Sequence, residues 1–145
     1  MKATIVGTRS LELDGDVVQI VLDELGNLGS RGFTEILIRK PLRRSRRPFE
    51  ALTASLAEVM GFTVTDYVPE PGGRALVFLR DVEMVRDSDE VVAFFPQSYY
   101  DGEDVMSGTA HVVDKALDQA KPVRAYAVVE GQAVLVGSDN EDSRV

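Results

Sequence analysis

Short apolar runs alternate along this chain with segments whose apolar residues recur every three or four positions. The runs cover residues 3–8, 33–38, 62–67, 91–95 and 123–129. The segments between them have the spacing of helices that bury one face. Strands that alternate with helices form a parallel sheet, because right-handed crossovers place the helices on its faces. We therefore predict one Rossmann-like α/β domain with about five parallel strands and helices on both faces.

The last apolar run is followed by a turn sequence. Glu130-Gly131-Gln132 predicts a hairpin into a short antiparallel strand at residues 133–136. The acidic residues that follow predict a disordered tail at 137–145, so the domain is expected to cover residues 1–136.

The segment 75–87 predicts a helix with one apolar face. The residues expected to face the core are Leu76, Leu79, Val82 and either Met84 or Val85. Arg80 then falls at the margin of the helix, where it could reach across a cleft. A surface pair with Glu83 or Asp87 is the alternative.

The composition excludes several kinds of site. The chain has 145 residues, no cysteine and one histidine, so disulfides, thiolate sites and multi-histidine zinc sites are ruled out and no metal is expected. No apolar run reaches the roughly 18 residues that span a bilayer, and the chain enters a strand directly instead of a signal peptide. These features predict a soluble, cytoplasmic protein without a membrane partner.

Basic residues are concentrated in one loop of an otherwise acidic chain, whose formal charge is −8. Residues 39–47 contain no acidic residue, and their six basic residues are Arg39, Lys40, Arg43, Arg44, Arg46 and Arg47. A loop between a strand and a helix lies at the carboxyl edge of the sheet, where ligands bind. Guanidinium groups there indicate a phosphate ester or nucleotide. The alternatives are a solvated loop or a contact for an acidic partner.

Two further segments are expected at the same edge. Gly7-Thr8-Arg9-Ser10 follows the first strand and offers backbone, hydroxyl and guanidinium groups, although such turns are often structural. Ser107-Gly108-Thr109 opens a helix, whose unpaired N–H groups favour phosphate, although an isolated tripeptide of this kind is more often a simple N-cap. The candidate ligand-binding residues are Gly7, Thr8, Arg9, Ser10, Arg39, Lys40, Arg43, Arg44, Arg80, Phe95, Ser107, Gly108 and Thr109.

The motifs together resemble the SLOG superfamily. They are Gly7-Thr8-Arg9-Ser10, the segments 79–84 and 87–94, Ser107-Gly108-Thr109, and Ala120-Lys121-Pro122-Val123. This Rossmann-like group includes Smf/DprA proteins, Lonely Guy phosphoribohydrolases, molybdenum-cofactor carriers and YspA-like proteins, and the YspA-like pattern of an Arg and a Met before an apolar strand is the most similar. The resemblance covers nearly all of residues 2–129. It implies a nucleotide-derived ligand over the carboxyl edge and a homo-oligomer.

The chain departs from the SLOG pattern at two places. Residues 39–47 replace a glycine-rich phosphate turn, and Val112 stands where the Lonely Guy hydrolases have a glutamate. Because valine cannot act as a base, we expect a binding protein with little or no catalysis and no required cofactor. His111 is assigned no catalytic role.

Two alternative functions remain open at this stage. One is cleavage of a nucleotide N-glycosidic bond, as in a phosphoribohydrolase or deoxyribosyltransferase. The carboxylates available for it are Asp81, Glu103, Asp104 and Asp114. The other is single-stranded DNA binding in the manner of Smf/DprA, with residues 39–47 on the backbone and Tyr99 and Tyr100 stacking on bases. The acidic remainder of the chain makes nucleic acid the less favoured partner.

Overall fold

The computed structural model describes residues 1–40, 48–97 and 108–138. They form one sheet of six strands in the order β3-β2-β1-β4-β5-β6, parallel except for the antiparallel β5–β6 pair. The α/β class and the parallel sheet predicted from sequence are confirmed. In chain order, the described elements are β1 (Lys2–Gly7), α1 (Gly15–Ser30), β2 (Glu35–Arg39), α2 (Pro48–Val59), β3 (Thr63–Tyr67), α3 (Arg74–Asp87), β4 (Glu90–Pro96), α5 (Gly108–Asp118), β5 (Val123–Val129) and β6 (Gln132–Ser138).

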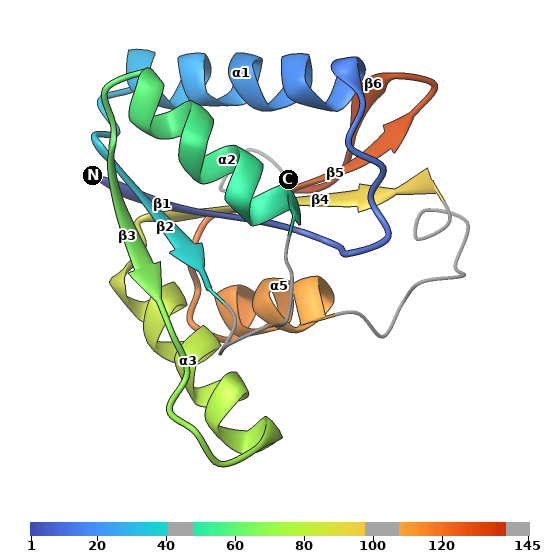
Figure 1. Cartoon of the computed structure of the whole chain (residues 1–145). Coiled ribbons are helices and arrows are strands. Elements are labelled where there is room, and N and C mark those ends of the chain that lie inside the picture. Colours follow the sequence, from blue (N-terminus) through green and yellow to red (C-terminus); the bar gives the residue numbers. More distant parts are fainter. Residues whose placement is uncertain (41–47, 98–107, 139–145) are drawn as a thin grey trace.

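The helices lie on both faces of the sheet. Helices α1 and α2 cover one face and α3 and α5 the other (Figure 1). The core is accordingly divided in two, with Ile5 and Leu25 among the buried residues on the first face and Met84 and Val112 on the second. Among the described residues, no helix has the length and apolarity needed to cross a membrane.

A close contact fixes the position of α2 over the end of β1. A Cβ built on Gly7 would lie 2.4 Å from Cδ1 of Phe49, so the ring occupies the space that any side chain at residue 7 would need. Phe49 itself is buried and packs on Phe94 of β4 with ring centroids 5.5 Å apart. Packing with Phe49 therefore accounts for the glycine at position 7 without any ligand.

The predicted inner face of α3 is partly wrong. Met84 and Val85 are fully buried, as expected, but Leu79 is 48% exposed, whereas Arg80 and Asp81 are 5% and 2% exposed. The reason is that Arg80 donates to the backbone oxygens of Lys40 and Tyr67, at the ends of β2 and β3. These carbonyls turn the polar side of the helix inward.

The final strand is longer than the sequence predicts. β6 runs from Gln132 to Ser138 and pairs with β5 along its length, with an irregularity between Ala125 and Tyr126. The hairpin turn is confirmed, and Glu130 and Gly131 both have positive φ angles, 51° and 77°. The strand therefore continues two residues beyond the domain end predicted at residue 136.

Candidate functional site

The order of the strands creates a switch point between β1 and β4. The connection after β1 leads to α1 on one face, and the connection after β4 leads toward α5 on the other face. In such sheets, ligands bind where the connections diverge at the carboxyl edge. Thr8 and Phe95 lie at this point, and both are buried. The amide of Thr8 donates to the Phe94 carbonyl at 3.2 Å, which holds the two strand ends together.

Arg39 joins its own strand, β2, to three other elements beside this switch point. Its side chain is fully buried. Nε lies 2.7 Å from Oε1 of Glu50 in α2, and Nη2 donates to the carbonyl oxygen of Gly7 at 2.9 Å and to Oγ1 of Thr109 in α5. Nη1 is also buried and has no hydrogen-bond partner among the described residues. The ends of β1 and β2 and the starts of α2 and α5 therefore meet at one guanidinium group.

Glu50 neutralises this buried charge and is itself held in place. Its side chain is 3% exposed, and Oε1 also accepts a hydrogen bond from the amide of Gly7 at 3.2 Å. Because both partners are sealed from water, removal of either would leave an unpaired buried charge.

Helix α5 is better suited to an anion than α1. The side chain of Asp14 caps α1 by accepting from the amide of Val17 at 3.0 Å, and Asp16 adds a negative charge to the first turn. The first turn of α5 contains no acidic residue. Since amides and the helix dipole attract anions at a helix N-terminus, the start of α5 is the more favourable end.

A second polar cluster continues from Arg39 along α3 and α5. Arg80 donates through Nη1 to the carbonyl oxygens of Lys40 at 3.0 Å and Tyr67 at 3.2 Å, and through Nε to Oδ1 of Asp81 at 2.8 Å. The other carboxylate oxygen of Asp81 lies 3.2 Å from Nδ1 of His111. The imidazole stacks on Phe78 with ring centroids 4.1 Å apart.

The structure brings some of the predicted site residues together and separates others. Gly7, Arg39 and Thr109 are in direct contact, and Arg80 reaches them through the backbone of Lys40. The Lys40 side chain points elsewhere, with Nζ 3.6 Å from Oδ2 of Asp66 in β3.

The other predicted positions are only partly placed. Arg9 and Ser10 are exposed in the loop after β1, where Ser10 donates to Oγ1 of Thr8 at 3.3 Å. Gly108 is the first residue of α5. Asp114, a carboxylate considered for catalysis, is exposed on α5. The remaining candidates lie outside the described residues: Arg43, Arg44, Tyr99, Tyr100, Glu103, Asp104 and Ser107.

Two contributors were not predicted from sequence. Glu50 follows the basic loop by three residues, so its pairing with an arginine could have been considered. The contact between His111 and Asp81 spans thirty positions and joins two helices, for which the sequence has no local signal.

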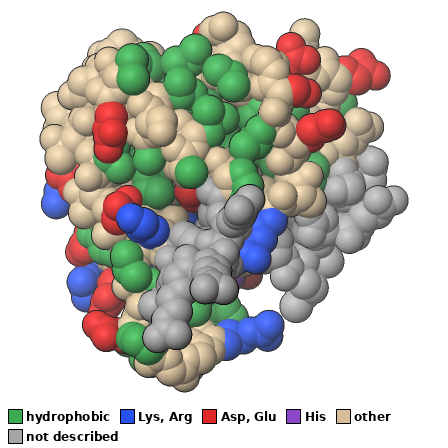
Figure 2. Space-filling view, viewed as in Figure 1, with side chains coloured by type: hydrophobic (Ala, Val, Ile, Leu, Met, Phe, Trp, Pro, Cys, Tyr) green, Lys and Arg blue, Asp and Glu red, His purple; other side chains and the backbone are tan. Residues whose placement is uncertain are grey.

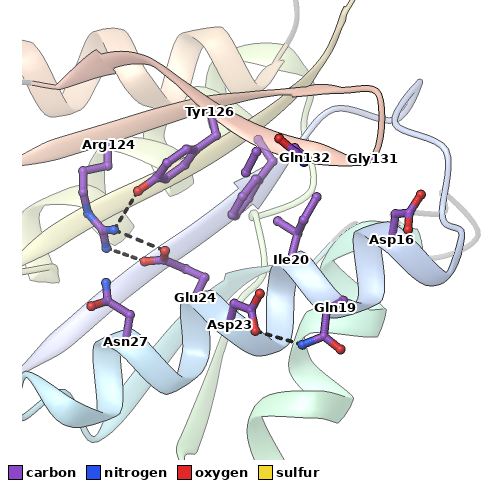
Figure 3. Close-up of a pocket in the computed structure, with 12 residues that line it drawn as sticks. Asp16, Gln19, Ile20, Asp23, Glu24, Asn27, Arg124, Tyr126, Gly131 and Gln132 are labelled. Atoms are coloured by element: carbon purple, nitrogen blue, oxygen red, sulfur yellow. Dashed lines mark hydrogen bonds and ion pairs between the residues drawn. The ribbon is translucent and has the colours of Figure 1, made fainter.

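A separate hollow lies between α1 and the β5–β6 hairpin (Figure 3), and Arg39 is not among the residues that line it. We name it the α1–β5 groove, and its volume is about 420 Å³. Its lining consists of Asp16, Gln19, Ile20, Asp23, Glu24, Asn27, Phe94, Arg124, Tyr126, Gly131, Gln132 and Ala133. Acidic side chains gather on the surface over the start of α1 and the β5–β6 turn (Figure 2).

The α1–β5 groove is closed at one end by ion pairs. Arg124 contacts Glu24 and lies 3.1 Å from Oε2 of Glu90, and Arg31 also pairs with Glu90 at 2.9 Å. Burial raises the pKa of the Glu24 carboxyl, while the hydrogen bond and charge of Arg124 oppose the rise and the Glu90 carboxylate adds to it. The two arginines and the two glutamates of this cluster balance in charge, so the cluster is explained by the ion pairs alone, without a ligand.

Within the parts of the chain that the structure describes, no cluster of three or more His, Cys, Asp or Glu side chains is suited to a metal ion. No protein-family model, no curated protein and no solved structure matches this chain.

Proposed function

We propose that this domain binds a phosphorylated, nucleotide-derived ligand at the carboxyl edge of the sheet. The site lies beside the switch point, between the ends of β1 and β2 and the start of α5. The observation that carries the proposal is Arg39, which is fully buried and joins these elements, and whose Nη1 has no acceptor within the described parts of the chain.

The unpaired nitrogen gives an energetic reason for an anionic ligand. A buried donor without an acceptor costs about 1–3 kcal/mol. A phosphate oxygen next to Nη1 would remove this cost and would add a charge-assisted hydrogen bond. The nearby amides at the start of α5 would stabilise the same group.

Binding without efficient catalysis fits the residues around this point. Val112 is fully buried in the core below the start of α5, so the position that holds a glutamate in the Lonely Guy hydrolases contributes only packing here. The resemblance to the SLOG superfamily supports a nucleotide-derived ligand over other phosphate esters. The side chain of Lys40 and the basic residues of the following loop would attract it from solution.

Thermal shift and calorimetric titration with a panel of nucleotides, cyclic nucleotides and ADP-ribose test the proposal. We expect at least one of them to raise the melting temperature, and the combined variant Arg43→Ala with Arg44→Ala to weaken its binding at least tenfold. Arg86→Ala is the matched control, because Arg86 is exposed in the last turn of α3. This turn leads into the start of β4, at the amino edge of the sheet and away from the proposed site. Absence of any shift would refute the proposal, and equal binding by the double variant would refute the part that it gives to the basic loop.

We also propose that the domain self-associates through the outer edge of β6. Every residue from Gln132 to Gly137 is exposed, and none carries a charge. The opposite edge strand, β3, carries Asp66, which pairs with Lys40. Charged edge strands resist pairing with other strands and uncharged apolar ones favour it. An antiparallel β6–β6 pair between two copies would satisfy the open backbone groups of both.

A further inference from the structure

His111 has one ring nitrogen held by a buried carboxylate. Nδ1 lies 3.2 Å from Oδ2 of Asp81, whose side chain is 3% exposed. A carboxylate can only accept a hydrogen bond, so Nδ1 carries the proton in this contact. In the neutral imidazole, Nε2 is then an acceptor without a proton.

The ring is fixed in orientation as well as in tautomer. Phe78 stacks on it with an interplanar angle of 25°. Asp81 is held by Nε of Arg80, and Arg80 is anchored on the carbonyls of Lys40 and Tyr67. A chain of contacts thus runs from the ends of β2 and β3 to Nδ1, and it leaves the other side of the ring for a further interaction.

Nε2 remains available next to the start of α5. Among the described residues it has no hydrogen-bond partner, and 20% of the His111 side chain is exposed. His111 is two residues after Thr109, whose hydroxyl contacts Arg39. Both residues lie in the first turn of α5, which begins at Gly108, so the imidazole is carried within one helical turn of the anion-binding end.

We propose that Nε2 of His111 accepts a hydrogen bond from a sugar hydroxyl of the ligand. This inference rests on the proposed function, which places the phosphate of the ligand at Arg39 and the start of α5. An acceptor cannot bond to a phosphate oxygen but can bond to a hydroxyl donor. In a nucleotide, the ribose hydroxyls are much nearer to the 5′-phosphate than the amino group of the base is. The ligand is therefore a ribonucleotide, and His111 distinguishes it from its deoxy analogues.

The histidine allows a direct measurement because the chain has no other. In protein labelled with ¹⁵N in histidine, all imidazole signals therefore come from His111. We expect the free protein, with the imidazole neutral, to show a proton on Nδ1 and none on Nε2. Saturation with a ribonucleotide should shift the Nε2 signal upfield, as a new hydrogen bond does, and leave Nδ1 protonated.

Binding of variants supplies the second measurement. We expect wild type to bind the ribonucleotide about 3- to 10-fold more tightly than the analogue without the hydroxyl, which is the effect of one hydrogen bond. His111→Phe keeps a ring for Phe78 to stack on, and it should bind both compounds equally, at the level of wild type with the deoxy analogue. Lys115→Ala, on the same helix, should retain the wild-type preference.

The outcomes separate this inference from the proposed function. A proton on Nε2 in the free protein, or tight ribonucleotide binding with an unchanged Nε2 signal, overturns the role of His111 and leaves the proposed function intact. Equal binding of the two compounds by wild type, or a shift caused only by a change in the amino group of the base, also overturns it. If no nucleotide binds at all, the proposed function fails and the inference fails with it.

Discussion

Arg39 and Glu50 form an ion pair that is closed to solvent, with Nε 2.7 Å from Oε1 and side chains that are 0% and 3% exposed. The pair connects the end of β2 with the first turn of α2, and both partners also bind the backbone of Gly7. The candidate site and the stability of the domain therefore depend on the same two side chains.

The substitution Glu50→Gln should destabilise the fold strongly. It leaves the guanidinium of Arg39 buried without a counter-charge, which costs about 3–5 kcal/mol in comparable pairs. The free energy of unfolding in urea measures the effect. Glu83→Gln is the control, because Glu83 is exposed on α3, and it should change stability by less than about 0.5 kcal/mol. A cost for Glu50→Gln as small as that of the control would show that the pair is unimportant.

A methyl group at position 7 should clash with Phe49. The Cβ of Gly7→Ala would lie 2.4 Å from the ring, and overpacking of this kind costs about 1–3 kcal/mol. Phe49→Leu should itself destabilise the domain, but in combination with Gly7→Ala the loss should be smaller than the sum of the single losses. Strict additivity in urea unfolding would contradict the contact.

Tyr67 should ionise at a higher pH than an ordinary tyrosine. Burial, a hydrogen bond to Asp87 and the charge of that carboxylate raise its pKa to about 12. The raised pKa favours the neutral phenol in the folded state. Its contribution to stability is therefore present below about pH 10 and is lost as the pH rises through the folded value. Tyrosinate absorbance of wild type minus that of Tyr67→Phe should isolate this late transition.

A variant of the partner separates the causes of this shift. Asp87→Asn should lower the pKa of Tyr67 without restoring its ordinary value, because burial, the largest cause, remains. The converse also holds, since the hydroxyl of Tyr67 lowers the pKa of Asp87. An unchanged tyrosine titration in Asp87→Asn would rule out the hydrogen bond.

A lysine on β6 should prevent self-association. Leu135 is 52% exposed on the edge strand, and Leu135→Lys places a charge where two β6 strands would pair. Val59→Lys is the matched control, because Val59 is 85% exposed at the end of α2. Light scattering during gel filtration should find dimers for wild type and Val59→Lys and monomers for Leu135→Lys. A wild type that stays monomeric at high concentration would refute the edge contact.

Met84 and Leu79, both on α3, should contribute differently to the stability of the domain. Met84→Ala removes a fully buried side chain and should cost about 2–5 kcal/mol. Leu79→Ala truncates a side chain that is 48% exposed and should cost well under half as much. Thermal unfolding of both variants checks the orientation of the helix, and a larger loss for Leu79→Ala would contradict it.

The strands were predictable because their apolar runs are local. Residues 91–95 and 123–129, for example, fall within β4 and β5. The orientation of α3 was not, because the groups that bind Arg80 are carbonyls of Lys40 and Tyr67. Backbone acceptors cannot be recognised in the pattern of side chains. The apolar periodicity therefore predicted that Leu79, and not Arg80, faces the core.

The candidate site was predictable only as a meeting of strand ends. Parallel strands bring the residues after them to one edge, and this places Gly7, Arg39 and Thr109 together. The burial of Arg39 depends on how α2 docks over Gly7, and the pairing of His111 depends on how α3 and α5 pack. Both follow from tertiary contacts between elements and not from spacing along the chain.

The register of the last hairpin sets Ser138 opposite Arg124, near the beginning of β5. Because β6 runs antiparallel to β5, the described chain returns to the amino edge of the sheet, whereas Arg39 lies at the carboxyl edge. In a binding assay with immobilised protein, attachment through a tag after β6 would leave the carboxyl edge, with the candidate site, accessible to ligand in solution.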